Sequence, residues 1–248
     1  MANPVKVRAE VKSVTQHGSG VYAVVLRPMS ALPRFKAGQF LHLTIDEYDP
    51  AGGFWPESRV FSIASAPGSQ DLEIVYSVKG KYTHRMETEL YAGKEVWLKL
   101  PYGSFTIDAA LKSDEDVVLI AGGTGISPYL AYLEQLQGSE PSSRRIRLYY
   151  GIRENDMVLA AELLDACCSA GLMQCFLYVE NEDPDGRLPK ASVKRSGRLQ
   201  CDSILLESSD LQKPVFFLSG PPGMIALFKR ELISASIDPE RIMIDEWE

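Results

Sequence analysis

The sequence lacks the long apolar runs, cysteine motifs and histidine clusters that define several large classes of protein. No apolar run reaches the ~18 residues that a membrane-spanning helix needs, and the longer ones, such as Val117–Ala121, have the length of a strand. The first residues carry no apolar segment of the signal-peptide kind, so we expect a cytoplasmic protein without membrane contacts. The three histidines are far apart, and no C-x-x-C or iron–sulfur spacing occurs among the four cysteines, Cys167, Cys168, Cys175 and Cys201. We therefore expect no metal site, and core-facing thiols at Cys167 and Cys168.

The chain also has fewer basic than acidic residues, 26 against 33. The formal net charge is −7, which argues against binding to nucleic acid. Lysines and arginines nevertheless gather in one stretch, at Lys79, Lys81, Arg85, Lys94 and Lys99. This stretch is either a solvated surface or a docking surface for an acidic partner, whose approach its charges would steer.

The first hundred residues favour short strands rich in β-branched and aromatic side chains, with glycine and proline turns between them. The expected strands are Val5–Val11, Val21–Leu26, Phe40–Ile45, Val60–Ala64, Leu72–Val78 and Val96–Leu100. Six such strands predict a six-stranded antiparallel β-barrel. The one helical pattern in this part is Thr83–Tyr91, with Met86 and Leu90 on one side.

The pattern changes after Phe105 to an alternation of strands and helices. The expected strands are Val117–Ile120, Ile146–Tyr150, Cys175–Val179, Val215–Ser219 and Ile242–Ile244, and the expected helices are Ile126–Leu136, Met157–Ala170 and Met224–Ala235. Such alternation predicts an α/β domain with a parallel sheet covered by helices on both faces. The polar stretch after residue 108 places the domain limit there, giving residues 1–110 and residues 111–248.

A glycine-rich turn, Gly122-Gly123-Thr124-Gly125, joins the strand at Val117–Ile120 to the next helix. Glycines let the backbone approach a phosphate closely, and the amides at a helix start favour an anion. Pro128 stands where the common G-x-G-x-x-G pattern has its last glycine, and no Lys-Ser/Thr pair follows, so the turn is not a P-loop. Taken alone, it indicates a nucleotide site only weakly.

Four motifs in order make the chain resemble the ferredoxin–NADP reductase superfamily, in particular its small bacterial flavoprotein oxidoreductases without a fused iron–sulfur domain. The motifs are Arg59-Val60-Phe61-Ser62, Pro101-Tyr102-Gly103-Ser104-Phe105, Gly122–Pro128 and Gly220-Pro221-Pro222-Gly223-Met224. The resemblance covers nearly the whole chain. It implies an FAD-binding barrel followed by an NAD(P)-binding α/β domain.

The resemblance implies FAD contacts at the end of the barrel. In the family motif Arg-x-Tyr-Ser, the arginine neutralises the FAD pyrophosphate and the serine lies near the flavin N5; here these are Arg59 and Ser62. Phe61 replaces the tyrosine, so it can stack on the flavin but cannot donate a hydrogen bond. Arg59 could instead form only a surface ion pair, for example with Glu57. The remaining FAD contacts implied are Val60, Tyr76, Ser77, Val78, Gly80, Lys81, Tyr82, Thr83 and the C-terminal Trp247.

On the nicotinamide side, the resemblance assigns the NAD(P) pyrophosphate to Gly123, Thr124 and Gly125, and the nicotinamide to Ser219, Gly220 and Pro221. Most relatives have cysteine where this chain has Ser219, and we expect slower hydride transfer in consequence. Arg153 and Arg187 match positions where relatives that use NADP carry an arginine for the 2′-phosphate, although Glu154, Glu180 and Glu182 oppose that charge. NADP is therefore expected, with NAD as the alternative. Thr83 could also be a helix cap, with or without a phosphate contact, while Trp247 could instead be a core residue and each arginine a solvated one.

The function implied is FAD-dependent hydride transfer from nicotinamide C4 to flavin N5, followed by electron transfer to a separate carrier. With no cluster-binding cysteines, that acceptor is expected to be a ferredoxin, a flavodoxin or an oxygenase component. Two alternatives stay open: a flavin or ferric reductase that uses free flavin as substrate, and an electron-transfer subunit that does not turn over NAD(P)H. The sequence does not determine the oligomeric state.

Overall fold

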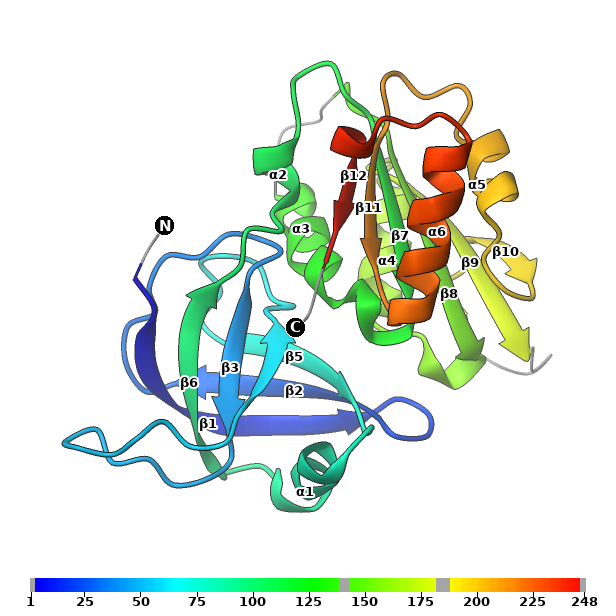
Figure 1. Cartoon of the computed structure of the whole chain (residues 1–248). Helices are drawn as coiled ribbons and strands as arrows, with labels where there is room; N and C mark the ends of the chain where they lie inside the picture. The colour runs from blue at the N-terminus through cyan, green and yellow to red at the C-terminus, as the bar shows by residue number, and fades with distance from the viewer. Residues whose placement is uncertain (1–2, 139–142, 182–187, 246–248) are drawn as a thin grey trace.

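The computed structural model describes residues 3–138, 143–181 and 188–245, which form a barrel and a helix-covered sheet packed against each other (Figure 1). The barrel strands are β1 (Val5–Gln16), β2 (Val21–Pro28), β3 (Phe40–Thr44), β4 (Arg59–Ser62), β5 (Leu72–Ser77) and β6 (Glu95–Tyr102). The helix α1 (Lys81–Glu89) lies between β5 and β6, and the short α2 (Ile107–Ala110) follows β6. The prediction of a six-stranded antiparallel barrel is confirmed.

The barrel is hydrogen-bonded in the order β4-β3-β6-β1-β2-β5, so it is almost but not fully closed. Alternate residues of β5, such as Leu72 and Ile74, point into the barrel core, while Val75 packs against the second part of the molecule. After β4, the Ala64 N–H donates to the Glu73 carbonyl at 2.8 Å and joins the two edges. Because Val75 of β5 packs against the second part, the open side between β4 and β5 faces the sheet.

The second part is built on a six-stranded parallel sheet in the order β10-β9-β8-β7-β11-β12. Its strands are β7 (Val117–Gly122), β8 (Ile146–Glu154), β9 (Gln174–Asn181), β10 (Val193–Ser196), β11 (Val215–Ser219) and β12 (Ile242–Ile244). Its helices are α3 (Ser127–Gln137), α4 (Ala161–Ser169), α5 (Cys201–Glu207) and α6 (Pro222–Ser234), with 3₁₀ turns η1 (Gly123–Ile126), η2 (Asn155–Met157) and η3 (Pro239–Arg241). The predicted parallel sheet with helices is confirmed.

Successive residues of β7 enter two different cores. Leu119 joins the core under α3 and α4, and Val118 joins the core under α5 and α6. Because both faces are covered, the strand is a continuous apolar run, which is why the sequence revealed it. The sequence pattern missed β10 and α5, because Val193–Ser196 is a short polar strand and Cys201–Glu207 spans only two helical turns. It also began the fourth helix too early, since η2 and a bend precede α4.

Strands β8, β9 and β10 follow one another on one side of β7, whereas β11 and β12 lie on its other side. The sheet therefore has a switch point between β7 and β11, which pair in parallel although about a hundred residues separate them. Open α/β sheets bind ligands at the carboxyl ends of the strands beside such a switch point. The domain limit at residue 110 stays a prediction; it falls between β6 and β7. Among the described residues, no helix combines the length and apolar character that crossing a membrane requires.

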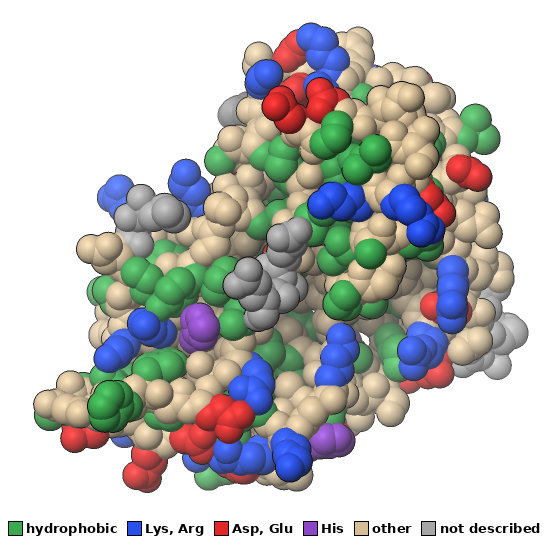
Figure 2. All heavy atoms as spheres, viewed as in Figure 1, with side chains coloured by type: hydrophobic (Ala, Val, Ile, Leu, Met, Phe, Trp, Pro, Cys, Tyr) green, Lys and Arg blue, Asp and Glu red, His purple; other side chains and the backbone are tan. Residues whose placement is uncertain are grey.

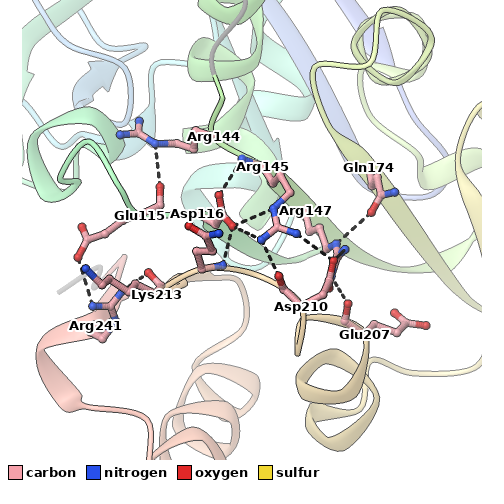
Figure 3. A network of polar contacts seen from close by, with 11 residues as sticks. Glu115, Asp116, Arg144, Arg145, Arg147, Gln174, Glu207, Asp210, Lys213 and Arg241 are labelled. Carbon is pink, nitrogen blue, oxygen red and sulfur yellow. Dashed lines mark hydrogen bonds and ion pairs between the residues drawn. The ribbon is translucent and has the colours of Figure 1, made fainter.

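A polar network ties the amino ends of the parallel strands together, at the end of the sheet opposite the switch-point loops (Figure 3). Its centre is the buried carboxylate of Asp116, which accepts hydrogen bonds from the Gln212 N–H at 2.7 Å and from the Arg145 N–H at 2.9 Å. The Arg145 guanidinium also donates to it at 2.8 Å. The network thus stabilises the sheet without reaching its carboxyl edge.

Candidate functional site

A large cleft lies between the open side of the barrel and the carboxyl edge of the sheet. Its volume is about 1560 Å³, above the ~300–1,000 Å³ of an ordinary ligand pocket. The walls come from β4, β5, the start of α1, the η1 turn, the ends of β8 and β9, and the start of α6. Figure 2 shows a hollow between the two parts with Lys and Arg side chains beside it. A cleft of this size has room for more than one extended ligand.

Arg59 lies at the barrel side of the cleft, on the first residue of β4. Its guanidinium stands over the ring of Tyr82, 4.5 Å from the ring centroid, and bonds to the Glu57 carboxylate at 2.6 Å. The Arg59 side chain remains 42% exposed. The ion pair with Glu57 is therefore formed, yet the guanidinium stays accessible to an anion entering the cleft.

The other residues of β4 and those of β5 continue this wall. Phe61 and Ser62 are buried and line the cleft, and the Phe61 ring centroid is 6.0 Å from that of Tyr76. Val60, Tyr76, Ser77 and Val78 also line it. The structure thus brings the residues predicted from the first motif and from the following strand onto one surface.

The start of α1 adds a helix N-terminus to the same wall. The Thr83 hydroxyl accepts hydrogen bonds from the N–H groups of Lys79 at 2.9 Å and Gly80 at 3.0 Å, which caps the helix. Gly80, Tyr82 and Thr83 line the cleft, whereas the exposed Lys81 is not part of its wall. Thr83 therefore both caps the helix and lines the cleft.

The glycine-rich turn forms the opposite wall. Gly123, Thr124 and Gly125 line the cleft within η1, and the Ser127 hydroxyl donates to the Thr124 carbonyl at 2.6 Å where α3 begins. A Cβ on Gly125 would lie 2.5 Å from the Gly220 Cα, against backbone that cannot rotate away. Only glycine allows this close approach of the two loops that follow β7 and β11.

Ser219 ends β11 and is completely buried, and its hydroxyl donates to the Asp245 carboxylate at 2.9 Å. Gly220 and Pro221 follow it along the cleft, and Asp245 lines the cleft as well. The sequence analysis missed Asp245, which is itself buried. Its position directly after the last apolar strand, at the carboxyl edge of the sheet, was the available signal.

Three charged groups line the cleft where strands β8 and β9 end. Arg153 is exposed at the end of β8, and Arg198 donates to the Glu180 carboxylate at 2.8 Å; all three line the cleft. The Arg195 guanidinium is instead bonded to Glu207, on the α5 side of the sheet. Arg187 and Trp247, which the sequence also indicated, lie outside the described residues.

Two carboxylates lie where the barrel meets helix α3 of the second part. The Ala66 N–H of the barrel donates to Glu134 of α3 at 2.6 Å. Glu73 of β5 lies near Glu134, and burial, with a smaller contribution from the Glu134 charge, raises the pKa of Glu73. Two carboxylates of like charge therefore oppose each other across the boundary between the two parts.

We expect Glu73→Gln to raise the free energy of unfolding at pH 7 by about 0.5–1 kcal/mol. A raised carboxyl pKa means that the folded state binds the proton more tightly, so ionised Glu73 destabilises the fold above its folded pKa. The gain should shrink as pH falls below that pKa and vanish below the unfolded pKa. Urea unfolding at pH 7 and pH 4 measures the free energy of unfolding, with the exposed Glu47→Gln as control. If both variants lost stability to the same extent, the argument would be contradicted.

Three helix starts converge on this one cleft: η1 leading into α3, α1 and α6. Helix N-termini present free N–H groups and a partial positive charge, which suits phosphate groups. With the Arg59 guanidinium beside them, they form a set of anion sites spread across both walls. The residues present therefore fit ligands that carry pyrophosphates.

Comparison with known proteins agrees with this geometry. Residues 119–230 match the family model described as the oxidoreductase NAD-binding domain. The chain is 28% identical over 249 residues to the reductase component of propane 2-monooxygenase from Mycolicibacterium goodii, a match that covers 97% of this chain and 67% of that protein.

Two solved structures share the fold over nearly the whole chain. The Amycolatopsis cytochrome P450 reductase GcoB superposes with a TM-score of 0.80 at 22% identity, covering 98% of this chain and 70% of that one. A ferredoxin NADP⁺ reductase from Neisseria gonorrhoeae, solved with bound FAD and NADP, superposes with a TM-score of 0.72 at 19% identity and covers 99% of both chains. At these identities the likeness concerns the fold alone. Together with the family model and the sequence relative, it confirms the resemblance to the ferredoxin–NADP reductase superfamily seen in the motifs.

Proposed function

We propose that this protein is an FAD-dependent reductase that takes electrons from NAD(P)H and passes them to a separate protein acceptor. The observation that carries the proposal is the single cleft of about 1560 Å³ with helix N-termini on both of its walls. A site for one dinucleotide would need one such wall, whereas this cleft presents phosphate-binding elements on the barrel and on the sheet. The relative from M. goodii is named a reductase component, which supports an oxygenase component or a ferredoxin-like carrier as acceptor.

In this proposal the barrel wall holds FAD and the sheet wall holds the nicotinamide nucleotide. The bound flavin supplies the chemistry, because it accepts a hydride from nicotinamide at N5 and can release electrons one at a time. The protein supplies orientation and contact distance. Arg59 and the start of α1 hold the FAD phosphates, Ser62 orients the flavin, and the loop at Gly123–Gly125 holds the NAD(P) phosphates.

Ser219 and Asp245 are proposed to position the nicotinamide. Asp245 accepts the Ser219 hydrogen bond, which fixes the hydroxyl at the end of β11. This pair faces the cleft from the sheet wall, opposite the β4 residues on the barrel wall. Residues of the two walls would thus hold the two ligands and exclude water from between them.

An anaerobic titration tests the proposed function. Protein purified with FAD is mixed with NADPH or NADH, and the flavin absorbance near 450 nm is followed, after which oxidised ferredoxin, flavodoxin or free FMN is added as acceptor. The proposal requires bleaching by a nicotinamide nucleotide and reoxidation by a protein carrier faster than by free flavin. Bleaching with reoxidation only by free flavin would favour a flavin reductase, and absence of bleaching would favour an electron-transfer subunit.

We expect Arg59→Ala to weaken FAD binding by about 10–100-fold, the effect of losing one charge-assisted contact to phosphate. The matched control is Arg85→Ala. Arg85 also stands over the Tyr82 ring, at 5.6 Å, but bonds to Asp46 and Glu89 and is not part of the cleft wall. FAD affinity is measured by the quenching of flavin fluorescence. Equal effects of the two substitutions would assign the loss to Tyr82 packing and not to the phosphate.

We also propose that NADPH is the preferred donor, with Arg153 and Arg198 near the 2′-phosphate. Arg198 neutralises Glu180, so that the carboxylate does not repel a phosphate at this end of the cleft. Arg153→Ala should raise the KM for NADPH about tenfold and leave the KM for NADH within twofold. Lys194→Ala, which removes an exposed cation outside the cleft wall, is the control. A lower KM for NADH in the unmodified protein would contradict the assignment.

A further inference from the structure

Three aromatic side chains lie together on the outer face of the barrel. Phe40 and His42 belong to β3, and Tyr102 ends β6. The Phe40 and Tyr102 rings are stacked with their centroids 5.6 Å apart, and the His42 ring meets the Tyr102 ring edge-on at 4.9 Å. All three are partly exposed, whereas Leu41 and Leu43 of the same strand point into the barrel core. The solvated face of an antiparallel sheet is usually polar, so this contiguous aromatic cluster indicates a contact surface.

The aromatic cluster continues the cleft wall that is proposed to hold the flavin. Across the β3–β4 pair, Phe40 lies opposite Ser62 and His42 lies opposite Val60. Side chains of such cross-strand partners are neighbours on one face of a sheet. Ser62 and Val60 both line the cleft. A molecule seated on the cluster is therefore one strand spacing, about 5 Å, from that wall.

The rings of the cluster are held in place before any partner arrives. A Cβ on Gly103 would lie 2.7 Å from Cδ1 of Phe40, so the glycine backbone packs directly on that ring. On the other side, the Ser58 hydroxyl lies 3.4 Å from Nδ1 of His42. Side chains that are already fixed lose little conformational entropy when a partner binds.

Two lysines accompany the cluster. Lys99 of β6 stands over the Tyr102 ring, with its Nζ 5.6 Å from the ring centroid, and the exposed Lys6 lies opposite Lys99 on β1. Within the described part of the chain, no carboxylate pairs with either lysine, and the nearby Glu95 carboxylate is bound by Arg8. In Figure 2 the barrel face beside the hollow shows hydrophobic side chains with Lys and Arg side chains among them.

The charge of this face differs from that of the whole protein. The formal net charge is −7, so an acidic molecule is repelled by the protein as a whole and attracted to a local excess of lysine. Arg85, which the sequence groups with Lys99, bonds instead to Asp46 and Glu89, which neutralise it. The local charge therefore favours an acidic partner on the aromatic cluster.

We propose that Phe40, His42, Tyr102, Lys6 and Lys99 form a docking face for an acidic protein that carries one electron. The proposal rests on the proposed function, which supplies the reduced flavin. The acidic rim of the carrier meets the two lysines, and its apolar centre meets the three rings. Two oxidised carriers dock in turn and each takes one electron, and the flavin proton is released to water. Such turnover requires a small, short-lived interface, which a few rings with charges at their rim provide.

The test measures electron transfer out of the protein by itself. Full-length protein loaded with FAD is reduced with one equivalent of dithionite and mixed, in a stopped-flow instrument, with oxidised cytochrome b5, an acidic one-electron carrier. Cytochrome c, a basic carrier, and benzoquinone, a small neutral acceptor, are used in parallel. The rate constant for cytochrome b5 should fall several-fold as salt is raised, because salt screens the attraction.

Charge reversal at the docking face should act on the acidic carrier alone. Lys99→Glu and Lys6→Glu should each lower the rate constant for cytochrome b5 about tenfold, since a rim charge acts mainly on association. Neither should lower the rate constants for cytochrome c or benzoquinone. Lys194→Glu, the matched control, makes the same change at an exposed lysine of the edge strand β10 and should alter none of the rates by more than about twofold.

The ring contacts are tested by His42→Ala at pH 8. Burial, together with the charge of Lys99, lowers the pKa of His42, so the side chain is uncharged at this pH. The substitution should lower the rate constant for cytochrome b5 and leave its salt dependence unchanged, because contact area is lost but no charge. An unchanged rate constant would remove the rings from the docking face.

Three results would overturn the docking face as a whole. One is equal effects of Lys99→Glu and Lys194→Glu, which would assign the attraction to net charge. Another is a rate constant for cytochrome b5 that does not depend on salt in the unmodified protein. The third is a dimer in sedimentation that Lys99→Glu dissociates, which would give the face to a second copy of the chain. Failure of NADPH to bleach the flavin would contradict the proposed function but not this proposal, because dithionite supplies the electrons here.

Discussion

Gly125→Ala should abolish NAD(P)H-driven flavin reduction, with a fall of at least about a hundredfold in turnover. The added Cβ would lie 2.5 Å from the Ser219 carbonyl carbon and 2.5 Å from the Gly220 Cα, and it would also meet the Ser219 carbonyl oxygen. These are backbone atoms, so the loop after β7 and the loop after β11 must move apart. A shift of about 1 Å between them is enough to misplace a nicotinamide ring against a flavin.

The same substitution should cost about 2–4 kcal/mol of stability, since overpacked sites force backbone shifts. Gly223→Ala is the matched control, because it adds the same methyl group to another glycine of the cleft wall, where no atom lies within 4 Å. Stopped-flow reduction by NADPH and thermal unfolding measure the two effects. Normal reduction by Gly125→Ala would show that the loops can separate without harm, contrary to the proposed role of their contact.

Asp116→Ala should reduce the free energy of unfolding by about 2–4 kcal/mol while leaving the affinity for FAD unchanged. The Asp116 side chain is only 8% exposed and accepts from Gln212, from the Arg145 backbone and from the Arg145 guanidinium. Its removal would leave the N–H groups of Gln212 and Arg145 without their carboxylate acceptor. The network, which Figure 3 draws, sits at the amino ends of the strands, whereas the cleft lies at their carboxyl ends.

The same residue should make the fold sensitive to acid. Burial by itself raises the pKa of Asp116, but the hydrogen bonds from Gln212 and Arg145 and the Arg145 charge outweigh it, so the pKa is lowered. A lowered carboxyl pKa contributes stability that is complete above the unfolded pKa and is lost as pH falls through the folded pKa. Asp116→Ala should therefore lose stability less steeply than the unmodified protein below about pH 4.

Asp210→Ala is the control for Asp116. Asp210 bonds to Arg145 at 3.0 Å and to Arg147 at 2.7 Å, but its side chain is 58% exposed, so its removal should cost far less stability than that of Asp116. Denaturant unfolding at several pH values compares the variants. If Asp210→Ala were as damaging as Asp116→Ala, the network would owe its stability to the surface pairs and not to the buried carboxylate.

The sequence by itself determined the local structure and the chemical types of the wall residues. Before Phe105 the sequence shows short strands separated by turns, and this pattern predicts a barrel. After Phe105 it shows apolar strands alternating with helices, and this pattern predicts a parallel sheet, because strands and helices each impose their own spacing on apolar residues. The glycines of Gly122–Gly125 indicate an anion site, because glycine lets the backbone approach a phosphate closely. Short polar strands such as β10 were not predicted, because four residues are too few to show an alternation of apolar and polar side chains.

The tertiary structure decided what depends on contacts between distant segments. It left the barrel open between β4 and β5, placed β11 beside β7, and so brought Arg59 and Gly125 to one cleft. It also joined the Ser219 hydroxyl to the Asp245 carboxylate. Strand order and side-chain contact arise from packing free energy summed over the whole chain, which no local pattern records.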